Sequence, residues 1–466
     1  MSNVDLQQLI ALLDAHNELT RIPVPTDPLL EIAAITDRVC KSFGGGKALL
    51  FESPAGSPFP VATNLFGSPR RVCLALGIDH LDRLTERMTQ LLDRIPSPDM
   101  PSLDRQIADL PEFSRFMPYF SPDPDPQLMA MEPPDLRLLP FLQSWPGDGS
   151  ACGYPRYITL GHVFTRHPES GLQNCGMYGA QLRGATELAL RWKAGSGAAR
   201  HLEEHRRLGQ PMPVAIALGG PPAATFSAML PLPGELDEIT FAGFLGLVAL
   251  DTVPCRSVPL QVPAGCELVI EGYVHPGETV EEGPFGNHTG CYSPAAIASL
   301  MRITAISHRR NAIIPATVVG PPPMEDCWMA KAWERLLLAF LKRLIPGVHE
   351  LCFPLEWVFH QSAIISLDNP SPAMVRETAA RLWNSPWFSG SRLLIFVDAG
   401  VDTSSMTGVA WQAINNCYFT RDSFCDGSGK RQALDATGCR TPRQRIVVDS
   451  ATVQRVAERW KEYGLP

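Results

Sequence analysis

The segment from Leu138 to Val319 constrains the fold most strongly, because short β-branched and apolar runs alternate there with glycine and proline. The runs TLGHVFT, MPVAIALG, CELVIEGYV and LMRITAISH have the length and composition of strands, and the glycines and prolines between them mark turns. We expect a helix to interrupt these strands at TELALRWKAG. A succession of many short strands predicts a β-barrel or a β-sandwich.

Helices and strands alternate on both sides of this segment. Asp27-Pro28 is typical of a helix cap followed by a proline at the first helical position, and Gly44 to Gly46 would end that helix. The other expected elements are strands at 48–51, 72–76, 363–367 and 393–397, and helices at 79–95, 328–344, from Ser371-Pro372 onward, after 397 and at 452–463. The alternation predicts α/β regions at both ends of the chain.

Proline and aspartate are frequent from residue 96 to about residue 140, which predicts an irregular linker between domains. A chain of 466 residues also exceeds the usual size of a single core. We therefore expect a multidomain α/β protein with an N-terminal α/β region and linker at 1–125, a strand-rich domain that carries the site at 126–322, and a C-terminal α/β domain at 323–466.

Composition and charge exclude several classes of partner. The formal net charge is -8 and no basic stripe is present, which argues against binding to nucleic acid. The N-terminal residues have no basic region and carry acids among the apolar positions, so they predict an amphipathic helix and not a signal peptide. No run approaches the ~18 apolar residues of a membrane span. The twelve cysteines form no CxxC pair. We expect a cytoplasmic protein with reduced thiols, most of them in the core.

Four stretches of the middle segment combine polar groups with glycine and proline: QNCGMYGAQL, LRWKAGSGAARH, PPAATFSAMLPLPGELDE and EEGPFGNHTG. In the last, Glu281, Glu282, Asn287 and His288 surround a turn. Such a loop can present an acid to a cavity, but a pair of glutamates is also typical of a solvated surface turn. Asn174 and Glu238 carry the oxygen atoms that Mg²⁺ or Mn²⁺ prefers, although spacing alone does not pair them.

Read together with ALLFESPAG, NLFGSPRRV, SWPGD and LDATG, these stretches resemble the UbiD family of prenylated-FMN decarboxylases. The similarity covers nearly the whole chain, and EGYVHPGETVEEGPFGNHTG resembles the family's signature segment over twenty positions. The resemblance implies a split β-barrel domain that binds the flavin, set between an N-terminal α/β region and a C-terminal α/β domain with a terminal oligomerisation helix.

The resemblance also implies a set of site residues. Asn174 and Glu238 match metal ligands, for Mn²⁺ or Mg²⁺ with potassium as a further ion, and the divalent ion bridges to the flavin phosphate in the family. The positions that match flavin-contacting residues are Met177, Tyr178, Gly179, Arg191, Trp192, Lys193, Ser196, Gly197, Leu230 and Pro231, with Lys430 or Arg431 near a basic residue that helps to hold the cofactor.

Three positions depart from the family pattern. Relatives carry an arginine where this chain has Gly179, and Asn287 stands where relatives have a second acid that donates a proton. An asparagine cannot donate a proton as a carboxylic acid does. Several relatives place a histidine ligand near Gly195, where this chain has His201 six residues later, so water could complete the coordination. Glu282 matches the first acid and is expected to lack its arginine partner.

The resemblance implies non-oxidative, reversible decarboxylation of an aromatic or α,β-unsaturated carboxylic acid, with a flavin prenyltransferase as the supplier of the cofactor and a homodimer or homohexamer as the assembly. Three interpretations of the departures remain open. The enzyme decarboxylates an unusual substrate with Glu282 handling the proton, catalyses a changed reaction, or binds the flavin without turnover. A flavin-binding scaffold, or a catalytically degenerate subunit of a larger complex, is the alternative from another class.

Overall fold

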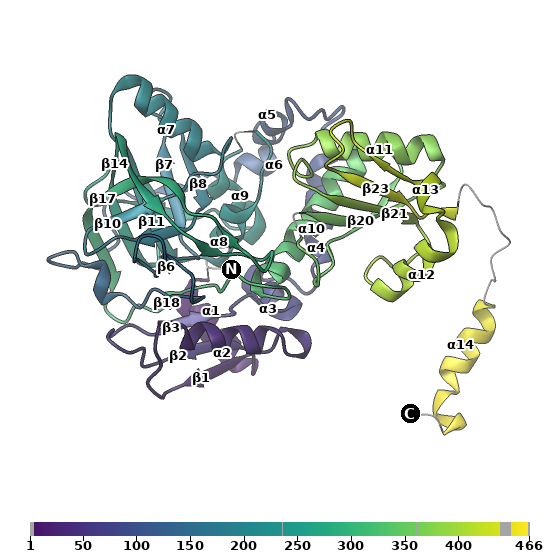
Figure 1. Ribbon diagram of the computed structural model, residues 1–466, viewed down its shortest axis with the longest axis horizontal. Helices are drawn as coiled ribbons and strands as arrows, with labels where there is room; N and C mark the ends of the chain where they lie inside the picture. The colour runs from purple at the N-terminus through teal and green to yellow at the C-terminus, as the bar shows by residue number, and fades with distance from the viewer. Residues whose placement is uncertain (1–3, 235, 360, 439–448, 465–466) are drawn as a thin grey trace.

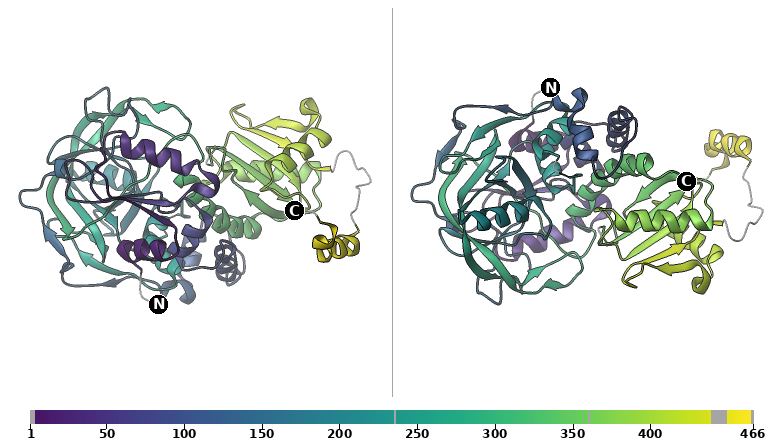
Figure 2. Two further views of the ribbon diagram at one scale, coloured as in Figure 1. Left: turned by 90° about the horizontal axis from the view of Figure 1, so that it is seen from below. Right: turned by 90° about the horizontal axis from the view of Figure 1, so that it is seen from above.

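The structure is a computed structural model that describes residues 4–464, apart from 235, 360 and 439–448. Three parts follow one another along the chain: an N-terminal region, a large curled sheet, and a C-terminal sheet covered by helices (Figure 1). Viewed from below and from above, the C-terminal sheet lies beside the rest of the molecule and is joined to it through α10 (Glu325–Leu344) (Figure 2). None of the helices in the described chain is long and apolar enough to cross a membrane.

The N-terminal region is closed by a strand from much later in the chain. Its four-stranded sheet has the order β1-β2-β3-β18, with bounds Leu19–Ile22, Ala48–Phe51, Val61–Thr63 and Ile314–Pro315. The helices of this region are α1 (Leu6–Ala15), α2 (Glu31–Cys40), α3 (Pro69–Leu76) and α4 (Asp82–Leu92), and α4 packs against α10. Because β18 follows the middle sheet, the N-terminal region and the middle part fold as connected units.

Two local predictions for this region are wrong. Residues 72–76 form the end of α3 and not a strand, because Ser68 accepts a hydrogen bond from the N–H of Arg71 and Pro69 opens the first turn. A short apolar run does not distinguish the two structures. Helix α2 begins at Glu31 and not at Pro28, because the Asp27 carboxylate accepts from the N–H of Leu29 and forms a separate turn.

The proline-rich segment from 96 to 140 is more regular than a linker. It contains the short helices α5 (Leu103–Ala108) and α6 (Pro111–Ser114) and the short strands β4 (Tyr119–Phe120) and β5 (Leu128–Ala130). β4 pairs with β12 (Asp251–Pro254), and β5 pairs with β17 (Ala296–Arg309). Tertiary pairing therefore orders a segment whose composition alone favours irregular structure.

The middle part is a nine-stranded sheet that curls into a half-barrel, as expected for a split β-barrel (Figure 1). Its order is β6-β9-β10-β17-β14-β11-β7-β8, and β5 pairs with β17 at the side. The bounds of the other strands are Tyr157–Ile158 (β6), His162–Arg166 (β7), Gln173–Met177 (β8), Ala180–Leu182 (β9), Glu187–Leu190 (β10), Met212–Gly219 (β11) and Cys266–Glu282 (β14). The predicted helix at TELALRWKAG is wrong, because residues 187–190 pair with strands on both sides despite their helix-favouring leucine and alanine.

Three helices accompany the curled sheet: α7 (Gly197–Leu208), α8 (Pro222–Met229) and α9 (Glu238–Gly246). Both α8 and α9 are buried over nearly their whole length, which their uniformly apolar sequences explain. The main core includes Leu9 of α1, Leu91 of α4, Phe241 of α9 and Leu337 of α10. One continuous core thus joins α1, α4, α9 and α10.

The C-terminal part confirms the predicted α/β alternation. Its sheet has the order β19-β20-β21-β23-β22, with bounds Val348–Cys352, Ser362–Leu367, Leu393–Asp398, Gln432–Asp435 and Ser423–Cys425. The helices are α11 (Pro372–Asn384), α12 (Met406–Asn416), α13 (Phe419–Asp422) and α14 (Ser450–Glu458), and no residue of α14 is buried. Eleven described cysteines carry free thiols, six of them buried, and Cys439 lies outside the described residues.

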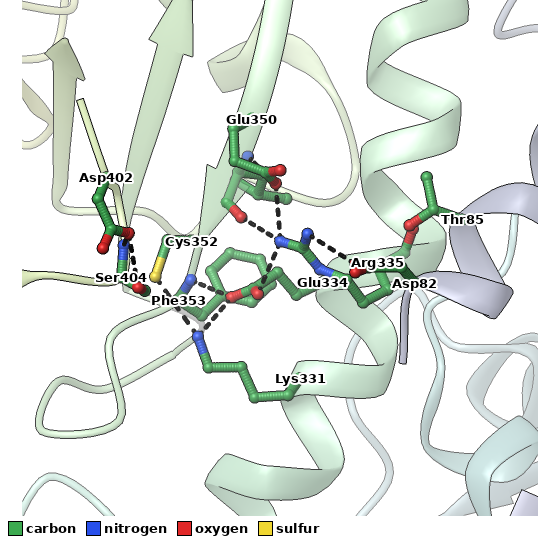
Figure 3. A network of polar contacts seen from close by, with 11 residues as sticks. Asp82, Thr85, Lys331, Glu334, Arg335, Glu350, Cys352, Phe353, Asp402 and Ser404 are labelled. Carbon is green, nitrogen blue, oxygen red and sulfur yellow. Dashed lines mark hydrogen bonds and ion pairs between the residues drawn. The ribbon is translucent and has the colours of Figure 1, made fainter. Parts of the chain in front are cut away.

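An ion-pair network ties α10 to its neighbours on two sides (Figure 3). Arg335 contacts Glu334 at 2.9 Å, Glu350 of β19 at 2.8 Å and Asp82 of α4 at 3.5 Å. Lys331 adds a bond to Glu334 at 2.8 Å. Because the carboxylates surround a half-buried guanidinium, the network fixes how the N-terminal region, α10 and the C-terminal sheet meet.

Candidate active site

Glu238 and Asn174 mark one end of the candidate site, which we name the metal end. Glu238 is the first residue of α9, and its Oε2 accepts a hydrogen bond from the N–H of Cys175 at 3.0 Å. Asn174 precedes Cys175 on β8. Although the residue is partly exposed, desolvation of its carboxyl group raises the pKa of Glu238 to about 8, and the Cys175 hydrogen bond offsets only part of that effect.

Tight packing holds the Asn174 amide against the start of α7. A Cβ added at Gly197 would lie 1.8 Å from Asn174 Oδ1, so a larger residue at 197 would displace the amide. Within the described chain, the Asn174 Nδ2 is buried without a hydrogen-bond partner. Ser196 caps α7 by accepting from the N–H of Ala199. The amide therefore faces a capped helix N-terminus, which favours a bound anion.

These features fit a divalent ion paired with a phosphate. An amide and a desolvated carboxylate are suitable oxygen ligands, and a cation would favour the ionised form of Glu238. The described residues form no cluster of three or more histidines, cysteines and acids that could hold a metal, so phosphate and water would supply the remaining ligands. Asn174, Glu238, Ser196 and Gly197 are the residues that would hold the pair.

Two aromatic rings continue from the metal end. Tyr178 lies edge-on to Trp192 with ring centroids 5.4 Å apart, and Trp192 Nε1 donates to Ser299 Oγ at 3.0 Å. The Tyr178 ring covers Gly176, where an added Cβ would come within 2.6 Å of it. Burial raises the pKa of Tyr178, while hydrogen bonding to Ser196 opposes this rise. The phenol is thereby tied to the metal end.

His201 is the histidine nearest in sequence to Gly195, and its Nδ1 is not directed at Asn174 or Glu238. His201 shares a hydrogen bond of 2.9 Å between that atom and Thr165 Oγ1, and burial lowers its pKa to about 4. Gly195 itself has a φ of 77°, a conformation that a histidine would adopt only with strain. The backbone at this turn therefore suits a glycine.

Glu282 marks the other end, which we name the proton end. It is the last residue of β14, and it is 6 % exposed while the neighbouring Glu281 is exposed. Successive side chains of a strand point to opposite faces, which places the two carboxylates on different sides of β14. The interpretation of this segment as a solvated surface turn is therefore wrong for Glu282. Burial, followed by the charge of Glu282, raises the pKa of Tyr157, which lies on the edge strand β6 of the same sheet.

Glu282 does have an arginine partner, contrary to expectation. Arg191 follows β10, and one of its terminal nitrogens lies 2.5 Å from Glu282 Oε2. The same nitrogen donates to the carbonyl of Pro294 at 3.0 Å and contacts the carbonyl of Glu282 at 3.3 Å. A buried carboxylate is costly without a counter-charge, and Arg191 supplies one. No sequence motif pointed to this pair.

Asn287 lies on the loop that follows Glu282. Its Nδ2 donates to Ser293 Oγ at 3.0 Å, and its Oδ1 is buried without a hydrogen-bond partner among the described residues. The next residue, His288, lies 3.3 Å from Asp326 in the first turn of α10. The loop thus connects the proton end to the helix that leads into the C-terminal part, a contact that sequence spacing does not reveal.

The other residues implied by the resemblance are spread over β8, the segment after β10, the end of α8 and the C-terminal part. Met177 ends β8 and is half-buried, and Lys193 is exposed. Leu230 is buried after α8, and the carbonyl of Pro231 accepts from Trp387 Nε1 of the C-terminal part at 2.9 Å. Lys430 is exposed, whereas Arg431 pairs with Asp426 at 2.6 Å inside the C-terminal part. Their roles toward a cofactor stay predictions.

A surface hollow of about 500 Å³ lies elsewhere, in the N-terminal region, between Asn17, Phe43 and Arg70. It shares no lining residue with either end of the candidate site. We therefore place the chemistry at the curled sheet and not at this hollow.

Three domain families match successive parts of the chain. They are the N-terminal, the Rift-related and the C-terminal domains of 3-octaprenyl-4-hydroxybenzoate carboxy-lyase, at residues 10–90, 122–322 and 327–449. A protein of Archaeoglobus fulgidus is 36% identical over 91% of this chain and 86% of its own length. One of Aquifex aeolicus is 36% identical over 99% and 93%. Both are described as uncharacterized.

Solved structures agree with this match. The UbiD-class enzyme HmfF from Pelotomaculum thermopropionicum, in an evolved dimeric form with prFMN, has a TM-score of 0.82 and 25% identity over 98% of this chain and 99% of its own. The vanillic acid decarboxylase of Sedimentibacter hydroxybenzoicus, in its closed form, has a TM-score of 0.82 over 100% of both chains, and its 24% identity supports the fold alone.

The three-part fold and the matching domains define a carboxy-lyase. More particularly, the chain belongs to the UbiD family, because all three UbiD domains match in order and together span most of its length.

Proposed function

We propose that this protein is a non-oxidative decarboxylase of an aromatic or α,β-unsaturated carboxylic acid, and that it uses prenylated FMN with Mn²⁺ or Mg²⁺. The observation that carries the proposal is Glu282, a buried carboxylate held by Arg191 on the sheet that also carries Asn174. The prFMN in the HmfF structure supports the cofactor, and the aromatic acid in the family's name supports the substrate class.

Each end of the site would perform a different task. The bound prenylated flavin would supply an electron sink while carbon dioxide leaves the substrate. Asn174 and Glu238 would hold the ion that offsets the flavin phosphate. Glu282 would move a proton to the carbon that loses the carboxylate, since decarboxylation replaces that group by hydrogen. With Asn287 in place of a second acid, Glu282 would carry this transfer without a carboxylic partner at 287.

Gly179 bears on the substrate. An added Cβ would meet no atom within 4 Å, so the position is open where relatives carry an arginine side chain. The family's guanidinium clamp for a substrate carboxylate is therefore missing at this position. We infer that the acid differs in shape from the substrates of relatives.

A flavin-binding scaffold remains the second candidate, supported by the loss of the acid at 287. The test is to co-produce the protein with a flavin prenyltransferase, identify the released ligand by mass spectrometry, and assay a panel of aryl and acrylic acids for product and for solvent deuterium exchange. Prenylated flavin together with product or exchange is the expected result. Bound flavin without either outcome would favour the scaffold, and absence of flavin would refute the proposal.

A further inference from the structure

The proton end has to regain a proton after every turnover. In the proposed reaction the bond between the carboxylate and its carbon breaks, carbon dioxide leaves, and a C–H bond forms with a proton from Glu282. The Glu282 side chain is then a carboxylate, and at 6 % exposure it has little contact with bulk water. A second titratable group that water reaches is needed to return the proton. Asn287 does not serve, because its neutral amide does not titrate.

The loop after Glu282 offers one candidate. None of the five residues at 283–287 titrates, and the amide of Asn287 is directed at Ser293, to which it donates at 3.0 Å. His288 is the next residue, and it is therefore the first titratable side chain that follows Glu282 in the sequence. An imidazole changes its charge between about pH 5 and 8, which suits the uptake of a proton from water near neutral pH.

His288 lies where three parts of the molecule meet. Its Nδ1 is 3.3 Å from Oδ2 of Asp326 in the first turn of α10, and its ring centroid is 5.5 Å from that of Phe359 in the C-terminal part. The His288 side chain is 21 % exposed and that of Asp326 is 13 % exposed. The imidazole is thus held by its neighbours and still meets water. A carboxylate beside Nδ1 orients the ring and assigns proton exchange to Nε2.

Tyr157 is a second hydroxyl-bearing group at the proton end, but it is a poorer source of protons. Its hydroxyl donates to the carbonyl of Pro284 at 3.3 Å. Burial, and then the charge of Glu282, raise the pKa of Tyr157 above its ordinary value of 10, so the phenol holds its proton more tightly than usual. The comparison favours His288.

We propose that His288, oriented by Asp326, is the group through which the proton end takes its proton from solvent. The imidazolium gives one proton through water to the Glu282 carboxylate and becomes an imidazole, which solvent then protonates again. Asp326 stays a carboxylate throughout and is the positioning residue of the pair. This inference rests on the proposed function, and it adds the source of the proton that Asn287 does not supply.

Kinetics on flavin-loaded protein separate the first turnover from the later ones. We expect His288→Gln to form the first equivalent of product at the wild-type rate, because Glu282 is already protonated, and then to slow by about 10²-fold. Imidazole added to the buffer should restore most of the lost rate, because a small acid in solution replaces the missing side chain. His275→Gln is the matched control, since His275 is exposed on β14.

Asp326→Asn tests the positioning role with a second readout. Its first turnover should be intact and its later turnovers slower than those of the wild type. NMR of isotope-labelled histidine side chains in the full-length protein, with and without flavin, tests the pair without reference to turnover. His288→Gln identifies the His288 signals by their loss, and Asp326→Asn should shift the Nδ1 resonance.

The outcomes separate the inference from the proposed function. Equal steady-state rates of His288→Gln and His275→Gln would overturn the supply of protons by His288. A slow first turnover, or a loss that imidazole does not restore, would overturn it as well and make the residue structural. An unchanged Nδ1 resonance in Asp326→Asn would overturn the positioning role of Asp326. If the wild type gives neither product nor deuterium exchange, the proposed function and the proton supply both fail, while NMR still decides whether the pair exists.

Discussion

The two ends of the site solve the problem of a desolvated carboxylate in different ways. At the metal end, no ion pair of Glu238 occurs within the described part of the chain, and its pKa is raised to about 8. At the proton end, Glu282 has Arg191 at 2.5 Å. Under the proposed function the first carboxylate would take its counter-charge from a bound cation, whereas the second is compensated by the protein itself.

The departures from the family pattern are divided between the two ends. The metal end keeps the two matching ligand positions, Asn174 and Glu238, but departs at Gly195. Gly179 and Asn287 are the departures that the resemblance assigns to the proton end. We infer that a metal end can lose one ligand because water can replace it, and that a proton end can be rebuilt as long as its buried acid keeps a cation.

Glu238→Ala tests the dependence of the metal end on a cation and should give the largest effect. Removing the carboxylate deletes an anionic ligand. Even the loss of a residue that only hydrogen-bonds to a metal ligand lowers the affinity for the metal by about 10- to 100-fold. We expect flavin content to fall by about 10²-fold or more when metal is limiting, as measured by flavin absorbance against protein concentration.

Asp237→Asn is the control for that variant. Asp237 caps α9 by accepting from the N–H of Thr240, and asparagine keeps this cap. It should retain the flavin. Unchanged flavin content in Glu238→Ala would mean that the ion binds elsewhere.

Glu282→Gln tests the acid of the proton end and should give the next largest effect. A poised proton donor contributes about 10²- to 10⁴-fold in rate, so product formation and solvent deuterium incorporation should fall within that range. Glu281→Gln is the matched control, because the adjacent side chain is exposed. Both variants are compared at equal flavin loading. Equal activities of Glu282→Gln and Glu281→Gln would mean that Glu282 takes no part in the reaction, and the proposed difference between the two ends would be wrong.

Restoring the family groups sharpens the comparison from the other side. Asn287→Asp combined with Gly179→Arg should raise decarboxylation or exchange several-fold on a substrate typical of the family. The new carboxylate can accept from Ser293, which now contacts the Asn287 amide, and position 179 has open space. The single variants separate the two contributions. No gain in the combined variant would mean that the proton end has diverged beyond these two groups.

Local patterns repeated over many residues predicted a strand-rich barrel or sandwich and the C-terminal α/β alternation, and the resemblance to the family specified the split barrel. It did not predict α3 or β10, since short apolar segments are decided by their neighbours in space. Candidate ligands followed from the resemblance, position by position. The Arg191–Glu282 pair did not, because it depends on which strands lie beside β17, and strand order cannot be read from residue spacing.

A third carboxylate lies behind the proton end. Glu325 is the first residue of α10, is 1 % exposed and precedes Asp326, which contacts His288 on the Asn287 loop. Its Oε1 accepts from the N–H of Phe66 at 2.8 Å. Burial raises its pKa to about 7 from the ordinary value of 4.5, and the Phe66 hydrogen bond opposes only part of the rise.

Glu325→Gln should give the smallest effect of the series, and only on stability. Below pH 4.5 the carboxyl is protonated whether the chain is folded or unfolded, so its contribution to stability is fully present. Between pH 4.5 and 7 the unfolded chain ionises first, and the contribution to stability is lost as the pH rises through the folded pKa, by about 3 kcal/mol. We therefore expect the melting temperature of the wild type to fall between pH 5 and 8 by more than that of Glu325→Gln, whose amide keeps the bond to Phe66 and does not titrate.

Every sample contains saturating metal and flavin, so that titration of Glu238 does not contribute to the difference. Glu281→Gln, exposed on the same side of the site, should follow the wild type. If the melting temperatures of the wild type and Glu325→Gln change equally with pH, Glu325, like Glu282, is compensated within the protein. The pH dependence of stability would then come from the metal end.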